Sequence, residues 1–154
     1  ILKFDLCIVH LTIIIMGFFM NEIAVLYVDD EINNLNSFKA SFRLDYLVFI
    51  ANNASQANEI LVENPQIQVV ISDQRMPEIT GVEFLESVKE KYPSMIRIIL
   101  TAFSDLEVFE RAINMGMIFR YLEKPWHPLE IKIAIDNAFQ YYFLSNQLHS
   151  KNMD

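Results

Sequence analysis

Asp73 is the residue whose type and setting in this sequence most strongly indicate chemistry. It ends the apolar run Val69-Val70-Ile71-Ser72 and precedes Gln74-Arg75-Met76-Pro77, a sequence typical of a turn. Other polar groups also follow apolar runs: Asp29-Asp30-Glu31 after residues 23–28, Thr101 after 96–100, and Lys124 shortly after 118–122. Because the carboxyl ends of parallel strands converge on one crevice of an open sheet, we expect these groups to meet there.

Three carboxylates at one sheet edge repel one another, so Asp29, Asp30 and Asp73 predict a divalent cation. Ligand sets made only of oxygen suit Mg²⁺, which binds through one or two carboxylates, a carbonyl and retained waters. Lys124 and Thr101 add a positive charge and a hydroxyl donor, which suits a phosphoryl group. One carboxylate can then be a nucleophile that forms an acyl phosphate, while the metal and Lys124 offset the charge on the transferred oxygens.

The elements that must position these groups alternate from residue 23 onward. Nearly continuous apolar runs, as expected for strands buried on both faces, occur at residues 23–28, 47–51, 68–72, 96–101 and 118–122. Apolar residues at helical spacing lie between and after them: Ile32, Leu35, Phe38 and Phe42; Ala54, Ala57, Ile60 and Leu61; Val82, Leu85 and Val88; Leu106, Phe109, Ala112 and Ile113; and a longer stretch from Leu129 to Leu148. Five βα units in succession predict an α/β fold with three layers around a parallel sheet and right-handed crossovers.

The bulk composition narrows the class of protein. A chain of 154 residues, 53% of them hydrophobic, suits one domain of ordinary size. The net charge of −8 argues against binding of nucleic acid by this segment, since such binding needs positive charge to neutralise phosphates. The single cysteine, Cys7, excludes an internal disulfide and a cysteine-rich zinc site, and it favours a reducing cytoplasm.

The ends of the chain differ from its centre. Residues 1–19 are an apolar extension, which we interpret as upstream translation or an artefact ahead of a natural start at Met20; a membrane-associating leader and an extra packed element are the alternatives. The predicted domain covers residues 20–145. Residues 146–154 end the last helix and link to a possible output domain absent from this chain. The aromatic stretch 139–148 either covers the sheet or begins a signalling helix or coiled coil.

The chain resembles the receiver domains of bacterial two-component response regulators, which are chemotaxis-regulator-like proteins, over roughly residues 22–145. The resemblance is carried by four pieces in this order: Val28-Asp29-Asp30-Glu31, the stretch from Asp73-Gln74-Arg75-Met76-Pro77 to Gly81, Thr101-Ala102, and Lys124-Pro125-Trp126. It implies a flavodoxin-like (βα)5 fold whose five parallel strands have the order 2-1-3-4-5, with the site where that order reverses. It also implies a cis peptide at Lys124-Pro125.

The resemblance also implies a role for each residue of the site. Asp73 is the phosphoryl acceptor. Asp30, Asp73 and the backbone carbonyl of Arg75 bind Mg²⁺ directly, and Asp29 does so through water. Thr101 binds a phosphoryl oxygen and Lys124 pairs with the phosphoryl group. Tyr121 is the aromatic switch that turns inward with Thr101. Arg75 and Phe103 flank the pocket, and their bulk predicts slow self-dephosphorylation.

The function implied is a phosphorylation-dependent signalling switch and not an enzyme with its own substrate. A histidine kinase or phosphotransfer protein supplies the phosphoryl group and docks near Ile32 and Leu35. Phosphorylation changes the surface of the fourth helix, fifth strand and fifth helix, which then forms a homodimer or contacts an output domain.

Simpler readings exist for each position. Asp29 and Asp30 can be acids favoured at a helix N-terminus, Asp73 an ordinary turn aspartate, and Tyr121 a packing residue. Thr101 can be a plain strand end and Lys124 a solvated lysine. Two other classes of protein also remain: a phosphatase or phosphotransferase with an aspartyl nucleophile, and an interaction module that does not use phosphorylation.

Overall fold

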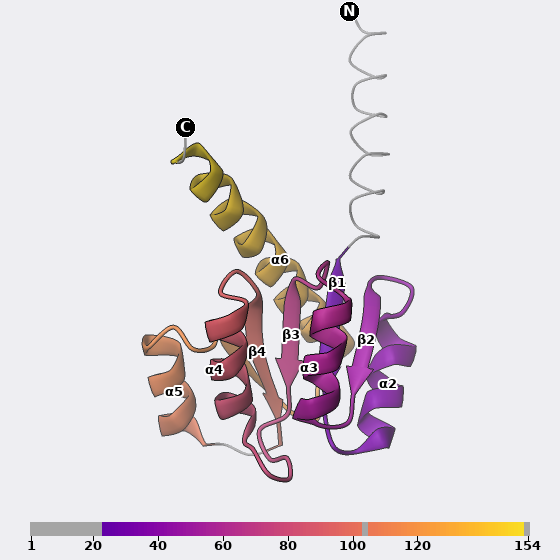
Figure 1. The fold of residues 1–154 in the computed structure, drawn as a ribbon. Coiled ribbons are helices and arrows are strands. Elements are labelled where there is room, and N and C mark those ends of the chain that lie inside the picture. The colour runs from indigo at the N-terminus through magenta and orange to yellow at the C-terminus, as the bar shows by residue number, and fades with distance from the viewer. Residues whose placement is uncertain (1–22, 103–104, 153–154) are drawn as a thin grey trace, which may run out of the picture.

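The computed structural model describes residues 23–102 and 105–152. The predicted extension at residues 1–19 lies outside them. Strands and helices alternate along the described chain (Figure 1). The strands are β1 (Ala24–Val28), β2 (Leu47–Ala51), β3 (Val69–Ser72), β4 (Ile96–Thr101) and β5 (Arg120–Glu123). The helices are α2 (Ile32–Phe42), α3 (Ala54–Glu63), α4 (Gly81–Lys91), α5 (Leu106–Asn114) and α6 (Pro128–Lys151).

The five strands form one parallel sheet in the order β2-β1-β3-β4-β5. The predicted α/β class and the strand order of a flavodoxin-like fold are confirmed. β1 lies between β2 and β3, so the chain crosses to the other side of β1 after β2, and the order in which strands are added reverses there. Polar residues that follow β1 and β3 are therefore brought side by side at the carboxyl edge of the sheet.

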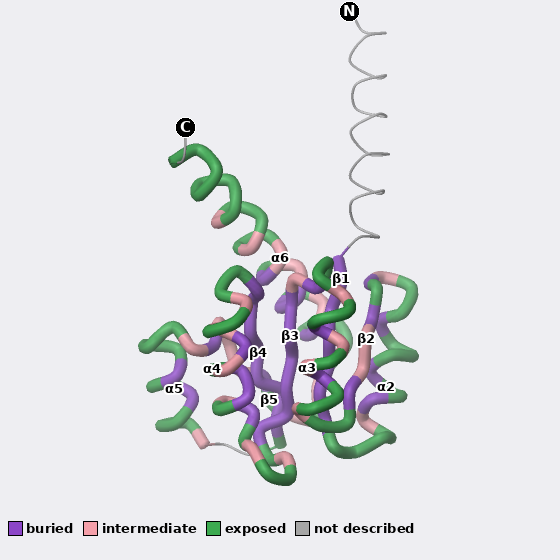
Figure 2. The backbone as a smooth tube through the Cα atoms, in the orientation of Figure 1, coloured by how far each residue is buried: buried purple, intermediate pink, exposed green. Residues whose placement is uncertain are grey.

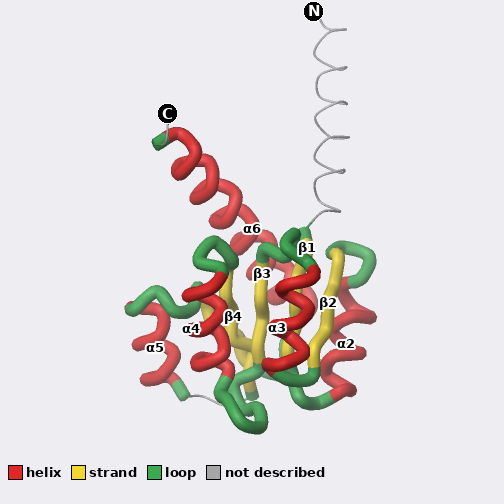
Figure 3. Tube along the Cα trace, viewed as in Figure 1, coloured by secondary structure: helices red, strands yellow, loops and turns green. Residues whose placement is uncertain are grey.

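Helices cover both faces of the sheet (Figures 1 and 3), and each face has its own hydrophobic core. Successive residues of a strand point to opposite faces, so Val25 and Tyr27 of β1 pack with α2 and α6. Ala24 and Leu26 pack instead with α3, α4 and α5. The central strands β1, β3 and β4 are thus buried on both sides, as Figure 2 shows, which is why their sequences read as continuous apolar runs. The edge strands β2 and β5 are partly exposed.

The last strand begins two residues later than the sequence predicts. Gly116 has a φ of 70° and follows α5, as expected for a residue that closes a helix. The backbone N–H groups of Met117 and Ile118 both donate to the carbonyl of Ala112, at 2.8 and 3.3 Å. These hydrogen bonds hold Ile118 in the helix-closing turn, so the apolar residue is buried but does not belong to β5.

Three residues of the predicted buried helical stripes are exposed. Ile32 and Leu106 are 58% and 45% exposed, because each is the first residue of its helix and lies at the edge of the sheet. Ile113, near the end of α5, is 37% exposed. Leu35 is only 2% exposed and packs in the core. The prediction that Leu35 contributes to a docking surface is therefore wrong, whereas Ile32 is accessible.

Helix α6 continues past the sheet (Figure 1). Its first half packs on the sheet through Ile131, Ala134, Ile135 and Ala138. Of the aromatic stretch, Phe139 and Tyr142 pack against this core. The other large apolar side chains of the second half, Tyr141, Phe143, Leu144 and Leu148, are exposed. Within the part of the chain that the structure describes, no helix is both long enough and apolar enough to cross a membrane.

Candidate functional site

Three acids form a cluster at the carboxyl edge of the sheet. Asp29 and Asp30 directly follow β1, and Asp73 directly follows the neighbouring strand β3. One carboxylate oxygen from each of the three lies within 4.8 Å of the others. Asp29 and Asp73 are buried, while Asp30 is exposed. The predicted convergence of these three residues is confirmed, and their oxygen-only donor set fits Mg²⁺ better than a softer metal.

Asp29 is the most heavily hydrogen-bonded of the three acids. Its Oδ2 accepts the Tyr27 hydroxyl at 2.5 Å and the ammonium of Lys124 at 2.5 Å. Its Oδ1 accepts the backbone N–H of Glu31 at 2.9 Å, and the Asn34 amide donates to both oxygens at 3.2 and 3.1 Å. Because an ionised carboxylate has about four lone-pair sites, this one has little capacity left for a direct metal bond.

Lys124 links Asp29 and Asp73. Its Nζ lies 2.5 Å from Asp29 Oδ2 and 3.5 Å from Asp73 Oδ1. The lysine follows β5 and precedes the cis Lys124–Pro125 peptide, as predicted. The backbone N–H of Lys124 donates to the carbonyl of Thr101 at 2.8 Å, which joins the ends of β5 and β4. The pairing of β4 with β5 therefore holds Lys124 in place, with its ammonium next to Asp29 and Asp73.

The surroundings of Asp73 shift the pKa of its carboxyl in opposite directions. Its burial raises the pKa of the carboxyl, and the neighbouring Asp29 raises it further, while the Lys124 charge and the backbone N–H of Gln74 lower it; burial dominates. A buried carboxylate whose charged form is disfavoured gains from any cation that enters the site. The acid cluster can therefore hold a metal.

The loop after Asp73 is folded back tightly onto α4. The Gly81 N–H donates to the Gln74 carbonyl at 2.9 Å, and the Val82 N–H donates to Gln74 Oε1 at 3.0 Å. A Cβ on Gly81 would lie 2.1 Å from the carbonyl oxygen of Asp73. Glycine at this position thus lets the helix start against the backbone of Asp73.

The remaining predicted residues lie around this core of the site. Thr101 is buried at the end of β4. Tyr121 is partly buried on β5, and its ring centroid lies 5.1 Å from that of Phe109. Arg75 is exposed in the loop that follows Asp73. Phe103, predicted to shield the pocket, lies outside the described residues.

Two residues that contact the site were not predicted. Tyr27 lies in β1, two positions before Asp29 and on the same face of the sheet, and Asn34 lies in the first turn of α2. Burial, and then the hydrogen bond to Asp29, raise the pKa of the Tyr27 hydroxyl, which keeps it a donor. The only hint in the sequence is a phenol within an otherwise aliphatic strand, at the spacing of two that puts side chains on one face.

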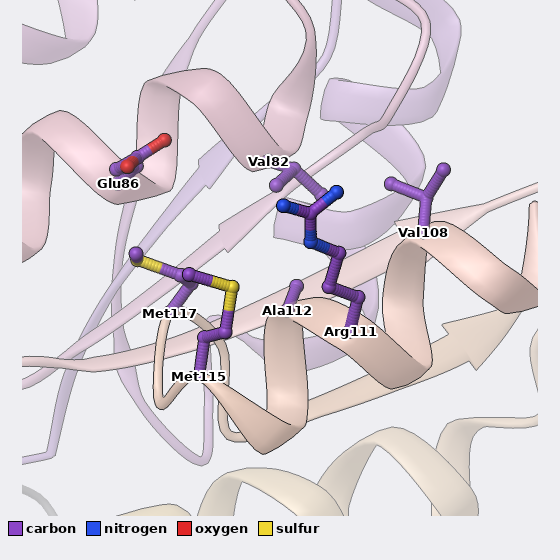
Figure 4. Close-up of a pocket in the computed structure, with 7 residues that line it drawn as sticks. All are labelled: Val82, Glu86, Val108, Arg111, Ala112, Met115 and Met117. Atoms are coloured by element: carbon purple, nitrogen blue, oxygen red, sulfur yellow. The ribbon is translucent and has the colours of Figure 1, made fainter.

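Two of the hollows in the described part of the chain differ in their relation to the site. One, of about 390 Å³, opens beside the site and is lined by Asn34, Ala102, Lys124, Pro125 and Trp126. The other, of about 270 Å³, lies between α4 and α5 (Figure 4). Its walls carry Glu86 and Arg111, with Met115 and Met117 at one end. Of these two hollows, the first is the one beside the chemistry, because it is lined by Asn34 and Lys124, which both bond Asp29.

Comparison with known proteins assigns this arrangement to a class. The model of the response regulator receiver domain matches residues 25–136, which include every acid of the cluster as well as Thr101 and Lys124. The chain belongs to the response regulator receiver domain family. It is therefore a receiver domain of the two-component type, a class whose members act as signalling switches.

Curated relatives of this chain are transcriptional regulatory proteins. The hydrogenase transcriptional regulatory protein HoxA of Cupriavidus necator is 30% identical over 133 residues, covering 86% of this chain and 27% of HoxA. HoxA of Bradyrhizobium diazoefficiens is 32% identical over 130 residues, covering 84% and 27%. This chain thus spans less than a third of the length of these curated relatives.

Among solved structures, a response regulator receiver domain protein from Clostridium thermocellum has a TM-score of 0.74 at 35% identity, covering 79% of this chain and 98% of that one. A structure named as an adenylate cyclase from Rhodopirellula baltica has a TM-score of 0.81 at 28% identity, covering 87% and 98%. These likenesses support the fold across the whole receiver domain.

Proposed function

We propose that this domain accepts a phosphoryl group on Asp73 from a histidine kinase or phosphotransfer protein and thereby switches a signalling surface. The observation that supports this best is the setting of Asp73. Its buried carboxyl lies 3.5 Å from the Lys124 ammonium and next to two further acids. An isolated turn aspartate would have neither the burial nor these partners.

The proposed chemistry uses Asp73 as the nucleophile. One of its carboxylate oxygens attacks the phosphorus of the donor phosphohistidine, the phosphorus–nitrogen bond breaks, and the imidazole leaves with the bonding electron pair and takes up a proton. An acyl phosphate on Asp73 results. Lys124 pairs with a phosphoryl oxygen, and the Thr101 hydroxyl donates to another. These two groups offset charge where the transferring group develops it.

Mg²⁺ is the proposed cofactor. Asp30, Asp73 and the backbone carbonyl of Arg75 would hold it directly, and Asp29, whose oxygens are occupied by other donors, would act through water. When bound, the ion supplies positive charge that lowers the repulsion between the acids and the incoming phosphoryl oxygens. The acid cluster supports this assignment because its donors are all oxygen.

The proposed switch uses Thr101 and Tyr121. Phosphorylation adds charge and acceptor oxygens to the pocket, which draws Thr101 toward Asp73 and leaves space for Tyr121 to turn inward. The surface affected is that of α5, β5 and α6, and its proposed partner is a second copy or an output domain. Ile32, exposed beside the acids at the start of α2, belongs to the proposed docking site of the kinase.

This domain is proposed to be the receiver of a longer cytoplasmic regulator, with an output domain that lies outside this chain. The curated relatives support this, since they are transcriptional regulatory proteins of which the chain covers 27%. The receiver itself is proposed to act as a phosphoacceptor without a substrate of its own. Residues 20–145 form the proposed domain, and residues 146–154 the link onward.

Intact mass spectrometry tests the proposal. The protein is incubated with acetyl phosphate with and without Mg²⁺, beside an Asp73→Asn variant. We expect one added phosphoryl group in the parent protein with Mg²⁺, and none in the variant or without the metal. An unmodified parent, or an equal adduct on the variant, would reject Asp73 as the acceptor.

A further inference from the structure

Tyr27 and Lys124 share one oxygen atom of Asp29. The Tyr27 hydroxyl and the Lys124 ammonium each lie 2.5 Å from Asp29 Oδ2. The Asn34 amide donates to the same oxygen at 3.1 Å. Hydrogen bonds to a charged acceptor are the short and strong ones, so three donors here compete for the charge of a single oxygen.

The ring of Tyr27 does not need this hydroxyl for packing. Tyr27 is fully buried, and its ring packs on Phe38 with centroids 4.5 Å apart. A phenylalanine would fill the same space in this aromatic core. The hydroxyl therefore adds one feature, the hydrogen bond to Asp29, which a buried phenol requires because an unpaired polar group in the core is costly.

The hydrogen bonds that Asp29 accepts from Tyr27 and Asn34 affect whether the Lys124 ammonium stays with Asp29 or moves to Asp73. Lys124 Nζ lies 2.5 Å from Asp29 but 3.5 Å from Asp73 Oδ1, so Asp29 is its main partner in this structure. Each donor that withdraws charge from Asp29 Oδ2 weakens the hold of Asp29 on the lysine. A weaker hold makes Lys124 easier to transfer to a phosphoryl group on Asp73.

We propose that Tyr27 is a positioning residue, whose hydroxyl, with the Asn34 amide, fixes Asp29 and sets how Lys124 is shared between Asp29 and Asp73. The Tyr27 hydroxyl donates to Asp29 and not to Asp73, so Tyr27 acts through Asp29. The inference rests on the proposed phosphorylation of Asp73, since it concerns the rate of that reaction.

A Tyr27→Phe variant tests the proposal by removing one oxygen atom and keeping the ring. The matched control is Tyr46→Phe, which removes another buried phenol, one that donates to Asp136 Oδ1 at 2.6 Å away from the acid cluster. The rate of phosphorylation by acetyl phosphate with Mg²⁺ is followed by intact mass. We expect Tyr27→Phe to slow it about tenfold, a change within the range of hydrogen bonds to charged groups, and Tyr46→Phe to leave it within about twofold.

A double-mutant cycle separates positioning from structural damage. The Tyr27→Phe change is repeated in a Lys124→Met background, with long incubation to measure the slower reaction. If Tyr27 acts through the lysine, its effect falls below about twofold there, because the two changes are coupled. An equal slowing in both backgrounds, or no slowing in the parent background, would overturn the proposal. A parent protein that takes up no phosphoryl group would instead reject the proposed function.

Discussion

Replacing Gly81 with alanine should damage the site more than the fold. Gly81 is the first residue of α4, and its N–H donates to the Gln74 carbonyl at 2.9 Å. A Cβ added to Gly81 would lie 2.1 Å from the carbonyl oxygen and 2.9 Å from the carbonyl carbon of Asp73. The atoms it meets are backbone atoms, so no side-chain rotation can make room.

The size of the effect follows from this geometry. Real Cβ contacts do not fall below 3.0 Å, so the Asp73 backbone and the start of α4 must separate by about 0.9 Å. Forcing a methyl group into a packed site costs typically about 1–3 kcal/mol of folding free energy. A displacement near 1 Å of a reacting group costs about 100-fold in rate. We therefore expect Gly81→Ala to lower the unfolding free energy by about 2 kcal/mol and to slow phosphorylation by about 100-fold.

Urea unfolding and acetyl phosphate labelling of the folded protein measure the two effects separately. The matched control is Gly116→Ala, at a position where the φ of +70° strains alanine but the added Cβ would meet only Lys89 Nζ, at an ordinary contact distance of 3.6 Å. Left-handed strain costs about 1–2 kcal/mol, so the control loses comparable stability while its labelling rate stays near that of the parent. Gly81→Ala labelling at the parent rate, or equal slowing in both variants, would refute the argument that Gly81 positions Asp73.

Three further changes have defined outcomes. Asp73→Asn should stabilise the metal-free protein at neutral pH, because burial, and then Asp29, raise the Asp73 pKa and so disfavour its charged form. This advantage should shrink as pH falls toward about 4, the ordinary pKa of an aspartate, because the folded parent takes up a proton at a higher pH than the unfolded chain does. A constant advantage in urea titrations across pH would contradict this. Thr80→Ala removes the capping box that Thr80 forms with Glu83 at the start of α4. It should lower the unfolding free energy by about 1 kcal/mol with an unchanged urea m-value. An unchanged midpoint of urea unfolding would argue that water replaces the cap. Arg97→Met removes the guanidinium that donates to the backbone carbonyls of Met95, Gly116 and Met117. It should lower the unfolding free energy by about 3 kcal/mol. A loss below about 1 kcal/mol would show that these carbonyls find other donors.

Much of the fold could be predicted from the sequence, because the central strands β1, β3 and β4 are buried on both faces and so read as continuous apolar runs. β2 and β4 have the bounds that the sequence predicts. The apolar pattern predicts Ile118 in the last strand, whereas the structure has it in a turn, because burial alone does not distinguish a strand from a turn. Ile32 and Leu106 fit a helical period but are exposed, since a period cannot show how far a helix extends past the sheet.

Five of the polar groups at the site could be placed there from the sequence. Asp29, Asp30, Asp73, Thr101 and Lys124 each follow a strand-like run, and parallel strands must bring their carboxyl ends to one edge. The resemblance then supplied the strand order that makes β1 and β3 neighbours.

The hydrogen-bond partners of these groups could not be predicted and are seen in the three-dimensional structure. It showed that Lys124 rests on Asp29 more closely than on Asp73, that Tyr27 and Asn34 share that carboxylate, and that Gly81 abuts the backbone of Asp73. The physical reason is that hydrogen bonds and steric contacts depend on distances of a few tenths of an ångström between residues far apart in the chain. Lys124 and Asp29 are 95 positions apart, and no local pattern encodes the distance between them.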